Sequence, residues 1–445
     1  MTPKINQYQL LPPWQLVLLA FIFWVAIFQL AHSPQHDFHS ILISASISFS
    51  CYGLLLYRRS LHFWHMVAVG LVARCLLIGV FPALSDDIYR FVWDGQLISQ
   101  GYNPYSHLPS DIIQDNIVGI TPELFTSLNS PNYYTIYPPV AQLMFWLSAL
   151  WSDIEHSAIT LQLLFLLAEC LTLLAITRLL AHVGKDCKLA AVYWLSPLII
   201  IEGVGNLHFE IIMLCTLLWS VYYLFVKENH KLSAALMAIS IASKLLPLML
   251  LPYIVYRLPW RSALRYLLVL GGLLLLMFIP IFMGIQITNF ASSVDLYFQK
   301  FEFNASVYYL LRYLGQIISG YNLIYYLGPA LGIITVYLIV KHATKNTAWS
   351  VQSFFKYSLF SFTAYLLLAT TVHPWYLTLP IAFAVFTESK YVLAWSALIF
   401  LTYINYSYSP YFENLWIVAL EYSIVAAILL YESIRHQSSF MTLAP

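Results

Sequence analysis

The chain has 445 residues, of which 60% are hydrophobic and only 9% are charged, and its formal net charge at pH 7 is +1. Soluble domains contain about a quarter charged residues, so this composition excludes an ordinary soluble protein. A charge this close to zero provides no basic field and excludes nucleic acid as the expected partner. The mean hydropathy of +0.74 predicts an integral membrane protein.

The predicted membrane spans follow one another along the chain, starting with a retained first helix rather than a cleaved signal peptide. Apolar runs of about 15 to 25 residues have the length of a membrane-crossing helix. We expect helices over residues 14–31, 40–57, 64–82, 158–182, 189–202, 209–226, 232–256, 263–284, 322–341, 354–370, 375–388, 390–406 and 415–432. The fold class is therefore all-α, a transmembrane bundle of about 12 to 14 spans in a single domain, 1–445.

Basic residues orient these spans, because Lys and Arg concentrate in cytoplasmic loops. We place Lys4, Arg58-Arg59 and the clusters at 178–188, 227–231, 257–265 and 341–345 in the cytoplasm. A large first external loop then covers 83–157 and a second covers 285–321. Basic loops flank both ends of 232–256, so we expect two short helices that run out to Lys244 and back.

The stretch "SDDIYRFVWDG" in the first external loop places two adjacent acids, Asp86 and Asp87, where the membrane meets water. Its apolar spacing predicts an amphipathic surface helix that Ser85 caps. One explanation is structural: the positive end of the helix dipole stabilises acidic side chains in the first turn. Alternatively, one aspartate is a general base whose pKa its neighbour raises, while Arg90 holds the other ionised.

Lys244 lies inside the apolar run "IASKLLPLMLL". A cation at mid-membrane costs about 2.5–3.5 kcal/mol on insertion scales. Snorkelling of the side chain to the interface is one explanation. The other is binding of a lipid phosphate, which a compact ammonium suits. Arg312 and Arg90 are the further candidate phosphate ligands.

Other polar residues collect on the same predicted outer face. We expect contacts with a sugar or an acceptor from Asn206, His208, Glu210, His373, Tyr137 and Asn304, and Lys300 is a further outer cation. Around Asn206 to Glu210, hydrogen bonding to sugar hydroxyls, a divalent-cation site and a purely structural turn remain alternatives. Arg74, Glu169 and Glu421 lie deeper in helices, where we expect packing roles. The five cysteines form no CxxC, so neither a disulfide framework nor a metal site is predicted.

Several of these stretches together resemble the C-type glycosyltransferase superfamily, and in particular its bacterial branch of polyprenyl-phosphate-mannose-dependent mannosyltransferases. The resemblance lies in the ordered set "SDDIYRFVWDG…GYNPY", "YPPVAQLMFW", "GNLHFE", "SKLLPLMLLP", "FEFNASVYYLL" and "HPWY". It covers about residues 80 to 376. "GNLHFE" departs from the family's "GHND"-like form, which leaves the roles of Asn206, His208 and Glu210 open.

The resemblance implies an inverting transfer of a mannose-like hexose from a polyprenyl-phosphate donor to an acceptor hydroxyl of a lipid or glycan. It implies Asp86 or Asp87 as the base and a site on the periplasmic side of the inner membrane of a bacterial cell envelope. No resident cofactor is expected, although a divalent cation is possible. The alternatives are a transporter or flippase of lipid-linked sugars, and a polymerase or ligase that joins lipid-linked glycans.

Overall fold

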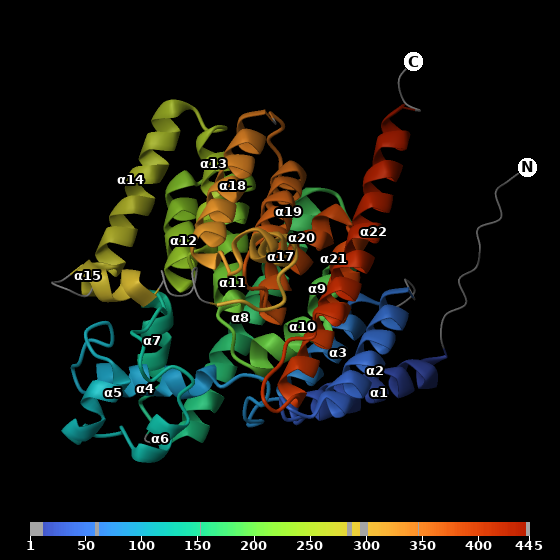
Figure 1. Cartoon of the computed structure of the whole chain (residues 1–445). Helices are drawn as coiled ribbons and strands as arrows, with labels where there is room; N and C mark the ends of the chain where they lie inside the picture. The colour runs from blue at the N-terminus through green and yellow to red at the C-terminus, as the bar shows by residue number, and fades with distance from the viewer. Residues whose placement is uncertain are drawn as a thin grey trace, which may run out of the picture.

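Helices form almost the whole of the computed structural model (Figure 1), which describes residues 12–57, 62–151, 153–282, 287–293, 301–345 and 347–441. Within these ranges the extended structure is one isolated bridge between Phe303 and Thr371. The predicted all-α class is confirmed. The expectations for Lys4, Arg58-Arg59 and Lys300 fall outside the described residues.

The first half of the chain builds two long helices, a group of short ones and then the centre of the bundle. Its elements are α1 Pro13–Ala31, α2 Phe38–Tyr57, α3 Phe63–Cys75, α4 Asp87–Ser99, α5 Pro109–Ile112, η1 Ile113–Asp115, α6 Pro122–Thr126, α7 Pro139–Ser148, α8 Ile154–His182, η2 Cys187–Ala190, α9 Ala191–Trp194, α10 Pro197–Ile200, η3 Ile201–Gly205 and α11 Glu210–Phe225.

The second half packs around this centre. Its elements are α12 His230–Ser243, η4 Leu246–Leu250, α13 Leu251–Val255, α14 Trp260–Met277, α15 Ile279–Phe282, α17 Val307–Ser319, α18 Ile324–Lys345, α19 Val351–Leu368, η5 Pro374–Leu377, α20 Thr378–Thr387, α21 Lys390–Leu398, η6 Ile399–Ser407 and α22 Leu415–Met441.

Six helices in the described part of the chain are long and apolar enough to cross a membrane. A seventh is added if Cys187–Trp194 and Pro197–Gly205, which are bent by 60°, count as one span. These helices indicate a multi-pass membrane protein. The number is below the predicted 12 to 14, because the remaining predicted crossings fall on shorter, broken or less apolar helices.

The predicted first external loop forms a group of short helices, α4 to α7, at one end of the bundle (Figure 1). The expectation of a surface helix over "SDDIYRFVWDG" differs from the structure, because most of α4 is buried and α4 packs against α7. The predicted cap also differs. Asp86 is the N-cap residue, and the Oγ of Ser85 accepts the backbone N–H of Asp87 at 3.3 Å.

The predicted reversal of the chain at Lys244 is confirmed. Helix α12 ends at Ser243, Lys244 has extended backbone, and η4 and α13 follow directly. The two ends of this segment, His230 and Arg257, line the same cavity. Lys244 therefore lies at the far tip of a short helical hairpin, well away from the basic loops.

A fully buried ion pair holds the centre of the bundle together. The Nη2 of Arg74 on α3 lies 2.6 Å from the Oε2 of Glu169 on α8, and neither side chain is exposed. Arg74 also donates to the carbonyl of Trp194 at 2.8 Å and lies 3.8 Å from the centre of that indole ring. Breaking a buried pair typically costs about 3–5 kcal/mol. The pair therefore fixes the bend that follows Trp194.

Candidate active site

The two adjacent acids lie where the chain enters α4, and they have different surroundings. Asp87 is half-buried and accepts a hydrogen bond from the Nδ2 of Asn129 at 3.2 Å. Asp87 also interacts with Tyr137. Burial, and then the negative charge of Asp87, raise the pKa of the Tyr137 phenol well above its ordinary value. Asp86 is exposed at its surface. Partial desolvation, and then the charge of Asp87, raise the pKa of the Asp86 carboxyl.

Arg90 does not contact either of these acids. Its Nε lies 2.8 Å from the Oδ1 of Asp94 one turn on, and its Nη1 donates to the carbonyls of Ser130 and Tyr133. The other oxygen of Asp94 accepts from Gln142 at 2.8 Å. Arg90 therefore does not pair with an adjacent aspartate as expected. Asp86 and Asp87 also lie about one helical turn away, but the guanidinium is held by Asp94 and by two loop carbonyls.

Lys244 forms an ion pair with Glu210, the first residue of α11. The Glu210 side chain is fully buried, whereas 31% of the Lys244 side chain remains exposed. The ammonium also lies 5.3 Å from the centre of the Tyr376 ring. Lys244 is therefore anchored on one side and accessible on the other, an arrangement that allows it to contact an external anion.

The turn between η3 and α11 brings Asn206 and His208 close to the buried carboxylate of Glu202. The Nε2 of His208 lies 3.2 Å from the Oε2 of Glu202, and Asn206 donates to the same oxygen at 3.4 Å. The other oxygen of Glu202 accepts the hydroxyl of Tyr403 at 3.2 Å. Asn206 also accepts the backbone N–H of Leu84, just before the two acids. The turn thus connects to the start of the external loop.

Four rings form a continuous stack beside this turn. His208 stacks on Trp375 at 3.7 Å between ring centres, Trp375 on His373 at 4.4 Å, and His373 on Phe303 at 4.7 Å. The backbone of Phe303 pairs with that of Thr370 and Val372 on either side of the bridge. Burial first, and then the charges of His208 and Lys244, lower the pKa of His373 to about 3. His373 is therefore neutral at ordinary pH.

Tyr376 connects the lysine to the acids. The charges of both Glu210 and Asp87 act on its hydroxyl, and Lys244 faces its ring. Tyr406 is a second neighbour of the two acids, although burial and Tyr411 affect its phenol more than the charges of Asp87 and Asp86 do. Asp87 and Lys244 thus both lie near Tyr376, and we call the surroundings of this ring the candidate region. Helix α4, which begins at Asp87, lies with α5 to α7 at one end of the bundle (Figure 1).

Asn304 and Arg312 belong to a neighbouring network. Asn304 is fully buried, and its Nδ2 donates to Glu421 at 3.2 Å while its backbone N–H donates to Glu413 at 2.6 Å. Arg312 pairs with Glu302 and lies 4.3 Å from the centre of the Tyr309 ring. In the described part of the chain, Arg312 and Lys244 thus have different acidic partners, Glu302 and Glu210.

Sequence reasoning did not single out several residues that complete the region. Tyr376 on η5 and Tyr406 on η6 lie near the acids. Tyr403, also on η6, donates to Glu202, and Glu413 after η6 accepts the backbone N–H of Asn304 in the neighbouring network. The one available signal was the aromatic run "YINYSYSPYFEN", whose Glu413 is a rare charge in an apolar segment. For metal binding, no group of three or more His, Cys, Asp or Glu side chains with suitable placement occurs in the described ranges.

Residues 47–259 match the family model described as the N-terminal domain of alpha-(1->6)-mannopyranosyltransferase. The chain is similar to this mannosyltransferase family. Alpha-(1->6)-mannopyranosyltransferase A of Corynebacterium glutamicum is 24% identical over 202 residues. That alignment covers 42% of this chain and 39% of the relative, so the chain spans well under half of that mannosyltransferase's length. No solved structure matches the chain.

These matches confirm the resemblance to mannosyltransferases that the motifs predicted. The matched range of the mannosyltransferase model includes Asp86, Asp87, the turn at 202–210 and Lys244. It ends before Asn304, Arg312 and His373. The acids and the lysine therefore lie in the part of the chain that the family model covers. Tyr376 and three of the four stacked rings lie beyond it.

Proposed function

We propose that the chain is an inverting mannosyltransferase that uses a polyprenyl-phosphate-linked hexose and acts at the extracytoplasmic face of the inner membrane. One observation carries the proposal: the Lys244 ammonium and Asp87, the neighbour of Asp86, both lie near the ring of Tyr376, in a chain similar to a mannosyltransferase family. A cation for a leaving phosphate and a carboxylate for an incoming alcohol are the two groups that such a transfer requires.

Lys244 would bind the donor phosphate. Its side chain is 31% exposed and lies at the tip of the α12–α13 hairpin, so a lipid phosphate has access to it from the bilayer edge. Pairing with Glu210 keeps the ammonium in place before the donor arrives. In the transfer, the bond between the anomeric carbon and the phosphate oxygen breaks, and polyprenyl phosphate leaves with the electron pair. The fixed cation stabilises that developing negative charge.

Asp86 would act as the general base. It is exposed, and in the described residues no hydrogen bond occupies its carboxylate, whereas Asp87 is engaged by Asn129 and Tyr137. The raised pKa of Asp86 brings it closer to the pH at which a base works best. It accepts the proton of the acceptor hydroxyl as the hydroxyl oxygen attacks the anomeric carbon. Asp87 contributes the charge that raises this pKa.

The acceptor is a hydroxyl of a lipid or glycan. The relative's name specifies an alpha-(1->6) linkage, and a single inverting displacement gives an alpha product only from a beta-linked donor. We therefore propose a beta-linked polyprenyl-phosphate mannose as the donor. The polar turn at 202–210 and His373, which face the same region, would contact the sugar.

The donor assignment can be tested with the purified chain in proteoliposomes. The vesicles receive radiolabelled polyprenyl-phosphate mannose, polyprenyl-phosphate glucose or a nucleotide-activated mannose, each with an extracted envelope glycan as acceptor. We expect label in the acceptor from polyprenyl-phosphate mannose. Transfer from the nucleotide sugar in vesicles that contain no polyprenyl phosphate would overturn the assignment.

A further inference from the structure

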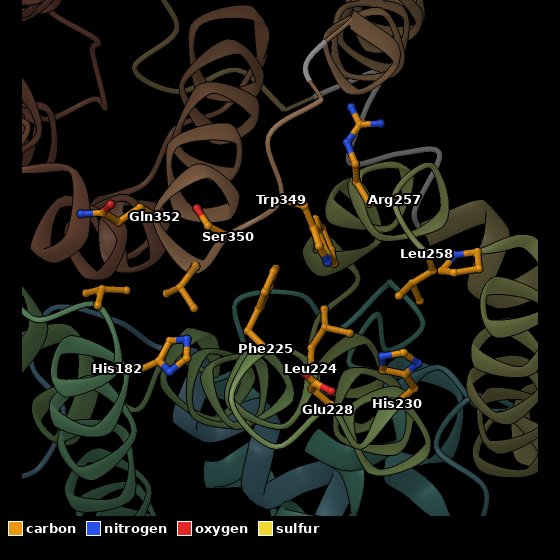
Figure 2. A pocket seen from close by; sticks show the side chains of 13 residues that line it. His182, Leu224, Phe225, Glu228, His230, Arg257, Leu258, Trp349, Ser350 and Gln352 are labelled. Atoms are coloured by element: carbon orange, nitrogen blue, oxygen red, sulfur yellow. The ribbon is translucent and has the colours of Figure 1, made fainter.

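A cavity of about 600 Å³ (Figure 2) has His230 in its lining, at the end of α12 opposite to Lys244 and the candidate site. It is enclosed by the C-terminal ends of α8 and α11 and by the segments that lead into α12, α14 and α19. A second hollow of about 370 Å³ shares Glu228 and His230 with it. We call the two together the basic hollow. Because they share two wall residues, one ligand can contact both.

The walls of the basic hollow combine an apolar floor with a cationic rim. Phe225 and Trp349 pack with ring centres 4.4 Å apart, and Figure 2 shows His182 and His230 on opposite sides of these rings. The second hollow adds the cations Lys227, Lys231 and Arg265. These three side chains are exposed and form no ion pair within the described ranges.

Acids do little to balance these cations. Glu228 is the one acidic residue among the described residues that line the two hollows. The basic hollow therefore has a net positive charge and donors available for an anion.

The basic hollow is distinct from the candidate active site. His230 and Lys244 mark the two ends of α12, a helix of 14 residues, and at 1.5 Å per residue these ends are roughly 20 Å apart. The hollow also lies at the ends of two helices that are long enough to span a bilayer, Ile154–His182 and Trp260–Met277. Lipid headgroups lie at this level of a membrane. Basic pockets between membrane helices commonly bind anionic lipid headgroups.

We propose that the basic hollow binds the phosphate headgroup of an anionic phospholipid from the adjacent leaflet. The phosphate contacts the cations Lys227, Lys231 and Arg265, and the glycerol and upper acyl chains lie against the floor formed by Phe225 and Trp349. The chemistry recognised is a phosphate monoanion, which a lipid or a free phosphate can supply. The apolar floor favours the lipid, because a free phosphate gains nothing from contact with it.

The proposal can be tested by native mass spectrometry of the delipidated full chain titrated with phosphatidylglycerol. The test variant is K227Q/K231Q/R265Q. The control variant is K341Q/K345Q/K356Q, which removes three exposed positive charges near the same end without touching either hollow. We expect at least a tenfold loss of phosphatidylglycerol affinity in the test variant and less than a twofold change in the control.

Further arms of the same titration distinguish the possible outcomes. Equal loss in both triple variants would show diffuse charge attraction and would overturn the site. Displacement of the lipid by millimolar inorganic phosphate would overturn the lipid assignment, whereas retention supports it. Phosphatidylcholine should bind the wild type more weakly than phosphatidylglycerol. Thermal melting of both variants confirms folding, and a phosphatidylglycerol with a photoreactive headgroup should label residues 224–231 and 257–266.

Discussion

Replacing Lys244 by methionine removes the cation that we place at the donor phosphate and also breaks the ion pair with Glu210. Two effects must therefore be separated. Loss of one partner of a buried pair typically costs about 3–5 kcal/mol of folding free energy. Glu210 is fully buried but 31% of the Lys244 side chain is exposed, so we expect the lower end, about 3 kcal/mol.

The double variant K244M/E210Q separates stability from catalysis. The glutamine removes the buried charge that the single variant leaves unpaired, so it should recover most of the lost stability. It cannot restore a positive charge at the leaving phosphate. Removing one such group from a preorganised site typically lowers kcat about 10²–10³-fold, and we expect a loss of this size in both variants.

The assay is transfer from labelled polyprenyl-phosphate mannose in proteoliposomes, with thermal melting in detergent measured on the same preparations. Lys356→Met serves as the matched control, because it removes an exposed lysine far from the site and should leave both readouts unchanged. A double variant that melts like the wild type and also transfers at the wild-type rate would refute the role of Lys244.

Three further predictions concern the acids and the core. Asp86→Asn should lower kcat/KM by at least about 10²-fold, the usual contribution of a general base, and full turnover would remove that assignment. In Asp87→Asn, the pKa of Asp86 loses one of the two causes that raise it; since Asp86 must be ionised to act, the acid limb of the kcat/KM profile should move to lower pH, and an unshifted limb would contradict this. Gly203→Ala would place a Cβ 2.5 Å from an oxygen of Glu169, which Arg74 holds in place. We expect a cost of about 1–3 kcal/mol from overpacking, measured as a lower melting temperature, and an unchanged melting temperature would show that the pair can shift.

Local patterns determined much of the fold. The apolar runs correctly predicted long helices, as for α8, whose observed start at Ile154 precedes the expected 158 by one turn. Basic loops on both sides of a short apolar run required the reversal at Lys244, and the structure has it. Charge placement was informative here because a lone cation inside the apolar part of a membrane costs free energy, so it must reach the interface or a partner.

Long-range pairing could not be predicted. Arg74 and Glu169 are 95 residues apart, and nothing local to either residue specifies the other. The four-ring stack likewise joins residues from three distant segments, and its parts read individually as ordinary interfacial aromatics. Arg90 illustrates a related limit: Asp87 and Asp94 both lie about one helical turn from it, and the sequence does not show that Asp94 is its partner.

The central claim is that each transfer breaks the bond between the anomeric carbon and the phosphate oxygen of the donor and forms a glycosidic bond on an acceptor. Quantitative mass spectrometry of both products, from proteoliposomes given beta-linked polyprenyl-phosphate mannose and acceptor, measures this directly. We predict one polyprenyl phosphate released for each alpha-linked mannose added. Intact donor appearing in the opposite leaflet, with neither free polyprenyl phosphate nor a mannosylated acceptor, would contradict the account.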